Sequence, residues 1–213
     1  MFAPYPRPDS AATPRPAFGR AAQHQPAHAT PHKARAEARY RRAARTAAEL
    51  LPELPAPGES VHALMTGTFD LCQVITATVP RLPACRHLHI ATLCFSKRNA
   101  AELLSLLDAR PDLALTVLVS SFFRDHNKAL FESFAADLGE HPSARLAAAR
   151  SHCKVVCFDV ADDDALVFEG SANLRTNKNR EQLTVFRDRP LHDWHAAWID
   201  EMVTQHAGRT ATA

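Results

Sequence analysis

The sequence lacks the segments that would direct a chain into or across a membrane. No apolar run approaches the ~18 residues that a transmembrane helix requires, and the first ten residues, MFAPYPRPDS, contain no apolar signal-peptide core. From these two absences we expect no membrane insertion and a cytoplasmic location.

Cysteine is scarce, with five residues in 213. An odd number of cysteines in a chain of this size is typical of reduced thiols, so we expect no disulfide framework. Cys153 and Cys157 are spaced CxxxC, but no second Cys/His pair with zinc-finger spacing follows them. The sequence therefore predicts neither a metal site nor a cofactor.

Negative charge is nearly absent from the start of the chain. Residues 1–45 contain nine Lys and Arg against Asp9 and Glu37, a net charge of +7. The other 168 residues contain 16 basic and 21 acidic residues, a net charge of −5. The overall value of +2 averages a basic tail and a mildly acidic body, which excludes a uniformly basic nucleic-acid-binding domain.

Proline and charge divide the chain into three parts. Ten of the 15 prolines fall in the first 60 residues, and residues 1–32 contain almost no aliphatic side chains larger than alanine. We predict a disordered Pro/Ala/Arg-rich basic tail over residues 1–58, with a possible Ala/Arg-rich helix at 33–51. Residues 59–207 are expected to fold, and 208–213 to be disordered. The helical segment is either solvated or a basic arm that touches nucleic acid or an acidic partner.

Strand and helix patterns alternate through the expected domain. The patterns predict strands at 61–65, 87–95, 113–119, 145–149, 153–158, 165–169 and 182–187, and helices at 70–82, 99–108, 122–138 and 190–206. The order βαβαβ, then several strands, then a helix, indicates an α/β sandwich with a mixed β-sheet flanked by helices.

Polar residues gather around three of the later strands. His152 and Lys154 are two residues apart, so on a strand both side chains would leave the same face. Ser171 and Asn173 repeat this spacing at the end of the next strand, and Glu181 opens the strand after it. A phosphodiester reaction needs a nucleophile, a cation and neutral donors that converge on phosphoryl oxygens, and this set supplies them without a metal.

Glycine and basic residues flank this group. Gly170 directly precedes Ser171, where the missing side chain would let the backbone approach a phosphate closely. Arg175, Lys178 and Arg180 follow and form either a solvated basic loop or a surface that guides a polyanion to the site. Gly170 and these three basic residues are the candidate substrate-binding residues.

The combined pattern resembles the signature of the phospholipase D superfamily. That signature is HxK, four residues, Asp, a short spacer and GSxN or GSxxN; the matching residues are His152-Cys153-Lys154, Asp159 and Gly170-Ser171-Ala172-Asn173. Glu181 matches the acidic residue that the superfamily often has downstream. The spacer before Gly170 is longer than usual because it contains Asp162–Asp164, which we interpret as an exposed hairpin turn.

The resemblance implies a metal-independent reaction through a covalent phosphohistidine. His152 would be the nucleophile or the acid, and Glu181 would hydrogen-bond its far ring nitrogen. Lys154 and Asn173 would hold the non-bridging oxygens, with Ser171 assisting.

Two features shape this expectation. Asp159 belongs to the catalytic motif. Side chains of a strand alternate between its two faces, so the odd spacing between His152 and Asp159 would place them on opposite faces, which favours a structural role for Asp159. The chain contains one motif, whereas the reaction uses two histidines. The resemblance thus implies a homodimer in which two motifs meet, as in the small Nuc-like nucleases of the superfamily.

We therefore predict a phosphodiesterase that acts on nucleic acid, with DNA as the expected substrate. Chain length, the single motif and the basic residues favour a nuclease over a phospholipid headgroup hydrolase, which is the alternative within the same chemistry. A nucleic-acid-binding or accessory protein that keeps the phosphate pocket without turnover, and a scaffold module, are the alternatives outside it.

Overall fold

The computed structural model describes residues 37–41, 46–175 and 178–207. Its strands are β1 (Glu37–Arg41), β2 (Glu59–Met65), β3 (Cys85–Thr92), β4 (Ala114–Ser120), β5 (Ala144–Ala149), β6 (Val155–Val160), β7 (Ala165–Gly170) and β8 (Glu181–Arg187). Its helices are α1 (Ala47–Leu50), α2 (Leu71–Thr78), α3 (Lys97–Ala109), α4 (Ser121–His126), α5 (Lys128–Leu138) and α6 (Arg189–His206), with a 3-10 turn at Val79–Arg81. None of the helices in these ranges is long and apolar enough to cross a bilayer.

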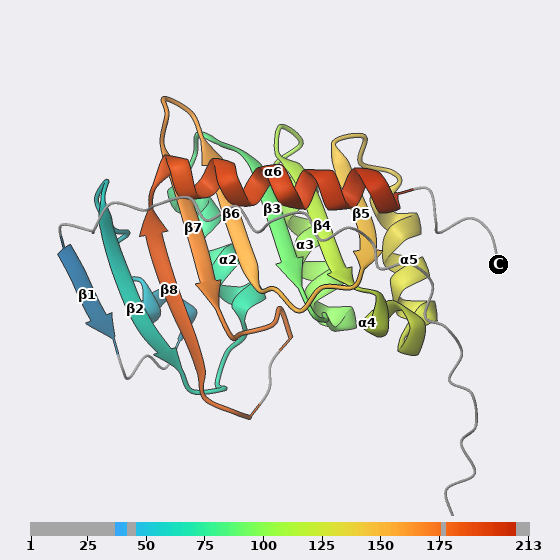
Figure 1. Cartoon of the computed structure of the whole chain (residues 1–213), viewed down its shortest axis with the longest axis horizontal. Helices are drawn as coiled ribbons and strands as arrows, with labels where there is room; N and C mark the ends of the chain where they lie inside the picture. The colour runs from blue at the N-terminus through green and yellow to red at the C-terminus, as the bar shows by residue number, and fades with distance from the viewer. Residues whose placement is uncertain (1–36, 42–45, 176–177, 208–213) are drawn as a thin grey trace, which may run out of the picture. The chain divides into compact units, whose positions relative to one another are not determined.

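All eight strands form one mixed sheet in the order β1-β2-β8-β7-β6-β3-β4-β5 (Figure 1). The pairs β1–β2, β3–β4 and β4–β5 are parallel, and the four pairs that link β2, β8, β7, β6 and β3 are antiparallel. As a result, β6 and β8 begin at the sheet edge where the other six strands end. We call it the carboxyl edge.

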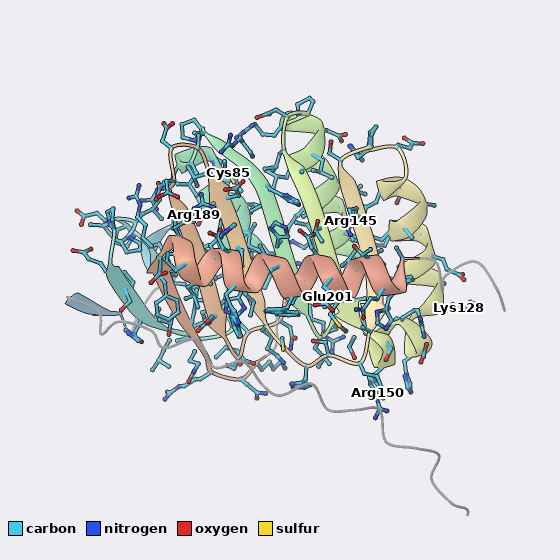
Figure 2. All side chains as sticks on the ribbon, turned by 45° about the horizontal axis from the view of Figure 1, so that its top comes forward. Cys85, Lys128, Arg145, Arg150, Arg189 and Glu201 are labelled. Carbon is cyan, nitrogen blue, oxygen red and sulfur yellow. The ribbon has the colours of Figure 1, made fainter. Side chains whose placement is uncertain are left out.

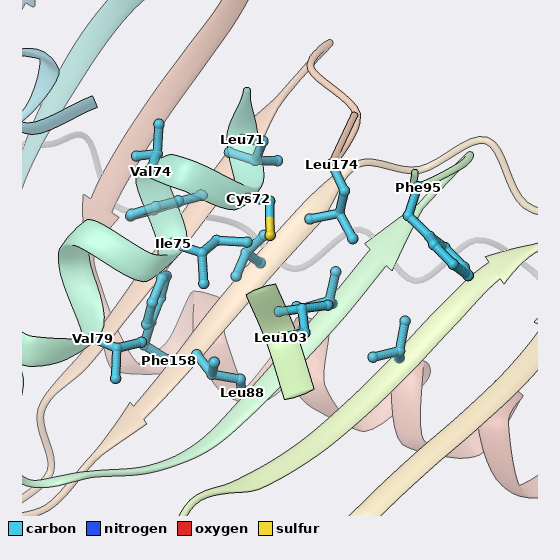
Figure 3. Close-up of a cluster of buried hydrophobic side chains, with 14 of the residues drawn as sticks. Leu71, Cys72, Val74, Ile75, Val79, Leu88, Phe95, Leu103, Phe158 and Leu174 are labelled. Carbon is cyan, nitrogen blue, oxygen red and sulfur yellow. The ribbon is translucent and has the colours of Figure 1, made fainter. Parts of the chain in front are cut away.

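Helices cover both faces of the sheet, α6 on one and α2, α3 and α5 on the other (Figure 1). Successive strand side chains point to opposite faces. In β6, Val156 and Phe158 therefore enter the larger core, while Val155 and Cys157 enter a smaller core under α6. The larger core joins strand residues such as Phe158 to side chains of α2 and α3 (Figure 3). The α/β sandwich with a mixed sheet is thus confirmed.

The folded region begins earlier than residue 59. Residues 37–41, inside the predicted helix 33–51, form β1 and pair with β2, so the helix prediction is wrong there. Pairing with the neighbouring strand β2 involves residues distant in the chain, so local helix propensity does not predict it. Leu50 and Leu51 are at most 1% exposed and join the core, so this part of the predicted tail is also folded. The remaining predicted disorder, at 1–36, 42–45 and 208–213, lies outside the described residues.

Two other predicted elements differ from the structure. The helix expected at 122–138 is two helices, because Asn127 between α4 and α5 has a non-helical backbone (φ −131°, ψ 42°). The strand expected at 153–158 begins at Val155. His152 and Lys154 therefore precede β6 and do not lie on it, and the Cys153 N–H donates to Ser151 Oγ at 3.2 Å in a local turn.

A buried histidine, His89, and a half-buried one, His87, lie on the face of β3 that α6 covers. The rings of His87 and His89 on β3 stack with centroids 3.8 Å apart, and His89 Nε2 lies 3.2 Å from Asp200 Oδ2 on α6. Burial lowers the pKa of His87. Burial, then the neighbouring charge of His87, lowers the pKa of His89 to about 4, although Asp200 opposes this shift. His89 is therefore neutral in the folded protein near pH 7.

Acid is expected to destabilise the protein through His89. Its pKa is about 4 in the folded state against the ordinary 6.5, so the unfolded chain binds more protons between these values. The contribution of the neutral His89 side chain to the free energy of unfolding is fully present above pH 6.5. It falls by about 3 kcal/mol as the pH drops to 4. His89→Leu should flatten this decline in urea unfolding measured from pH 7 to 4.5, whereas the exposed His152→Ala should keep it. An unchanged decline in His89→Leu would contradict the prediction.

Candidate active site

The candidate catalytic residues other than Asp159 lie at the carboxyl edge of the sheet. His152 and Lys154 come just before β6, Ser171 just after β7, and Glu181 at the first position of β8. The Gly170 N–H donates to the Lys154 carbonyl at 3.4 Å, which ties the first two segments together. The structure thus brings together the three segments that the motif spacing suggests.

Lys154 holds the imidazole of His152. Its Nζ donates to His152 Nδ1 at 3.0 Å and to the His152 carbonyl oxygen at 2.8 Å. An ammonium group can only donate, so Nδ1 is the acceptor and the neutral ring carries its proton on Nε2. His152 is exposed, and partial burial lowers the pKa of Lys154. The imidazole can therefore be reached by a ligand.

Alternating burial fixes the segment after β7. Ala172 and Leu174 are 3% and 0% exposed, so they anchor the segment in the core. Ser171 and Asn173 alternate with them and remain accessible. The Asn173 Oδ1 accepts the Leu93 N–H at 3.2 Å, which leaves the Asn173 NH₂ group to donate to a ligand. No motif signals Leu93, because it contributes a backbone group.

Ser171 hydrogen-bonds the first two residues of β8. Its hydroxyl donates to Glu181 Oε2 and accepts the Gln182 N–H at 3.0 Å. The resemblance predicts a contact between Glu181 and the imidazole of His152. Among the described residues, His152 instead hydrogen-bonds Lys154, and Glu181 hydrogen-bonds Ser171.

Gly170 allows β7 to approach β8 unusually closely. A Cβ at Gly170 would lie 2.1 Å from the Gln182 carbonyl oxygen, far inside van der Waals contact. The same oxygen accepts the Ser171 N–H at 3.1 Å. The close approach that Gly170 permits is therefore to a neighbouring strand, and it sets the position of Ser171. An approach of this backbone to a phosphate, as the sequence suggests, stays a prediction.

Basic side chains flank the site on the β8 side. Arg175, Lys178 and Arg180 are exposed on the segment between β7 and β8. Burial raises the pKa of the Cys94 thiol, while the charges of Arg175 and Lys154 oppose the shift. The charges of Arg175 and Lys154 therefore both reach this thiol, which follows the end of β3 by two residues.

Asp159 lies away from this group. Its Oδ1 accepts Arg189 Nη1 at 2.8 Å, at the start of α6, and Arg189 Nη2 also donates to the Val160 carbonyl at 3.0 Å. Asp159 therefore fastens α6 near the end of β6, whereas His152 precedes the start of that strand. This position favours a structural role for Asp159.

Asp159→Ala is expected to lower stability and leave the chemistry unchanged. The ion pair is partly exposed, and Arg189 keeps its carbonyl partners, so the loss should be about 1 kcal/mol, or ~2–4 °C in melting temperature. Thermal unfolding and initial rates of phosphodiester cleavage should be measured together. A cleavage rate that falls a hundred-fold without a change in melting temperature would instead place Asp159 in the chemistry.

The CxxxC pair does not converge. Cys153 is exposed before β6, whereas Cys157 is fully buried under α6. Burial raises the pKa of the Cys157 thiol, which opposes the thiolate form that metals bind. The two sulfurs therefore do not form a shared ligand site.

Comparisons with known proteins bear on the fold. No protein-family profile and no curated protein matches the chain. Among solved structures, NucT from Helicobacter pylori is 18% identical, and the match covers 70% of this chain and 99% of NucT with a TM-score of 0.51. Nuc from Salmonella typhimurium, a phospholipase D family member, is 16% identical over 61% of this chain and 88% of Nuc, with a TM-score of 0.45.

The likeness to NucT shows the fold. The chain has the α/β sandwich fold of NucT, as its element order predicts. At this level of identity the comparison concerns the arrangement of strands and helices.

Proposed function

We propose that the protein is a metal-independent phosphodiesterase of the phospholipase D type that cleaves nucleic acid through a covalent phosphohistidine. The observation that carries this proposal is the convergence of His152 and Lys154 with Ser171 and Asn173 at one sheet edge. An accessible imidazole beside an ammonium and an amide donor is suited to attack on a phosphodiester and to binding its charge.

Lys154 has two roles in this mechanism. In the free protein it donates to Nδ1 of His152, so the ring proton occupies Nε2, which cannot then attack phosphorus. A bound phosphate offers Lys154 a stronger acceptor, because a charged oxygen attracts an ammonium more than a neutral ring nitrogen does. Once Lys154 turns to a non-bridging oxygen, Nδ1 can carry the proton and Nε2 becomes the nucleophile.

The covalent step exchanges one bond for another. Nε2 of His152 attacks phosphorus, a P–N bond forms, and the bond from phosphorus to the leaving oxygen breaks. The leaving oxygen takes a proton from a second histidine. Water then attacks phosphorus, the P–N bond breaks, and the proton of water passes to the second histidine. Lys154 and the Asn173 NH₂ group stabilise the negative charge on the non-bridging oxygens.

The second histidine is supplied by a second copy of the chain in this proposal. One motif per chain provides one histidine of the required pair, and closed two-fold dimers are the commonest oligomers. Two carboxyl edges that face each other across a two-fold axis would place the two His152 side chains on opposite sides of one phosphate. In such a dimer, Glu181 could hydrogen-bond the Nδ1–H of an imidazole once Lys154 has moved away.

The direct test is cleavage of labelled nucleic acids in excess EDTA. The purified full chain should cut single- or double-stranded DNA or RNA without added metal, and light scattering should show a dimer. Binding without cleavage across the panel would favour the accessory protein over the enzyme. Release of a headgroup from phospholipid vesicles, with no nucleic acid cut, would favour the lipid hydrolase.

A further inference from the structure

The carboxyl edge carries an exposed aromatic pair that the proposed mechanism does not use. Phe122 at the start of α4 is 64% exposed, more than any other large apolar side chain in the described ranges. The ring of His126 lies against it with centroids 4.0 Å apart and a 32° angle between the planes. His126 Nδ1 also lies 2.8 Å from the Phe122 carbonyl oxygen, so the second ring is held in place.

The local sequence explains why this ring points outward. The next residue, Phe123, is 3% exposed and packs on Phe95 with centroids 4.7 Å apart. Neighbouring residues on a short helix diverge by about 100°, so anchoring Phe123 in the core leaves Phe122 outside it. Phe122 contributes little burial to the fold, and its removal should cost little stability.

Phe122 stands on the same sheet edge as His152. α4 begins directly after β4, whose last residue, Ser120, pairs with Ala149 at the end of β5. From Ala149 the chain runs through Arg150 toward β6, along the carboxyl edge (Figure 1). Strand spacing and maximal chain extension place the Phe122 and His152 backbones within ~25 Å, a span that a few nucleotides can bridge.

Positive charge lies between the aromatic pair and the catalytic group. Arg150 is exposed at the end of β5 and makes no hydrogen bond or ion pair within the described part of the chain. Figure 2 shows its side chain directed away from the sheet. Arg124 is paired with Asp125 at 2.8 Å, and Lys128 lies 3.7 Å from Glu132, so Arg150 is the cation most available to a phosphate here.

We propose that Phe122 and His126 form a stacking subsite for an unpaired base, with Arg150 on the phosphate between this base and His152. Aromatic rings stack on bases of any sequence, but in a duplex both faces of each base are already covered by its neighbours. The subsite therefore selects single-stranded nucleic acid. This inference rests on the proposed function only for the placement of the scissile phosphate at His152.

The test measures binding separately from cleavage. Anisotropy of a labelled 12-nucleotide DNA should be followed with His152→Ala as the inactive parent, and compared with a duplex of the same sequence. Adding Phe122→Ala should weaken single-strand binding about 5- to 150-fold and leave duplex binding unchanged. Phe122→Trp should retain binding. Trp194→Ala, which removes a 46%-exposed aromatic residue from α6, is the matched control and should change neither.

Arg150→Ala should weaken the binding of both the single strand and the duplex, and it should flatten the salt dependence of binding, because it removes a phosphate contact. Three results would overturn the stacking subsite. The first is a parent that does not bind the single strand at all. The second is an unchanged single-strand affinity in Phe122→Ala, and the third is an equal weakening of single-strand and duplex binding by Phe122→Ala. A loss of the dimer in Phe122→Ala would assign Phe122 to a contact between copies instead. If the native chain cleaves nucleic acid in EDTA but Phe122→Ala does not change binding, the proposed function stands and the subsite is wrong. If Phe122→Ala weakens single-strand binding but the native chain does not cleave, the subsite stands and the proposed function is wrong.

Discussion

Replacing His152 with alanine is expected to abolish cleavage, with a fall of more than about a thousand-fold in the single-turnover rate in EDTA. The variant removes the atom that forms the P–N bond in the proposed mechanism. Lys154 and Asn173 remain, so nucleic-acid binding should persist. The expected signature is loss of turnover with retained affinity.

A second histidine variant serves as the control. His141 precedes β5, at the opposite edge of the sheet from the candidate site, so His141→Ala should cleave at the native rate. Equal activity in the His152 and His141 variants would refute a catalytic role for His152. Trapped intermediate adds an independent readout, because a phosphohistidine is stable in base and labile in acid. An adduct that survives acid would point to a different nucleophile.

Gly170→Ala is expected to damage stability and activity together. The added Cβ would lie 2.1 Å from the Gln182 carbonyl oxygen and 3.0 Å from the Gln182 carbonyl carbon, both backbone atoms of β8. Strands β7 and β8 must then separate, and overpacking of this kind costs at least ~1–3 kcal/mol. Ser171 moves with them, and a displacement of about 1 Å at a catalytic group can cost a hundred-fold in rate.

Urea unfolding and EDTA-resistant cleavage of Gly170→Ala should be measured beside Gly139→Ala. At Gly139, at the end of α5, the nearest atom to an added Cβ is the Ala136 oxygen at 3.0 Å, and no active-site segment is involved. That control should cut nucleic acid normally and lose less stability. A Gly170→Ala protein with native stability and native activity would show that β7 and β8 have room that the structure does not indicate.

The alternation of apolar residues and the spacing of the motif are local properties, and the sequence alone contains them. The apolar run at 113–119 predicted a strand, and β4 spans Ala114–Ser120. The spacing of His152 and Lys154 from Ser171 and Asn173 predicted segments that meet, and with them a class of chemistry. Asp159, for which the sequence favoured a structural role, lies near the end of β6 and pairs with Arg189.

Other features depend on partners that are distant in the chain, and only the tertiary structure decided them. Residues 37–41 have helix-favouring composition but pair with β2, whose edge supplies the hydrogen bonds. Leu93 orients Asn173 across 80 positions, and Phe122 is exposed because Phe123 fills the core place beside Phe95. Local pattern determines which residues can form strands, helices and a phosphate site. Which side chains become neighbours is decided by tertiary packing between residues that are distant in the chain, so a short stretch of sequence does not reveal it.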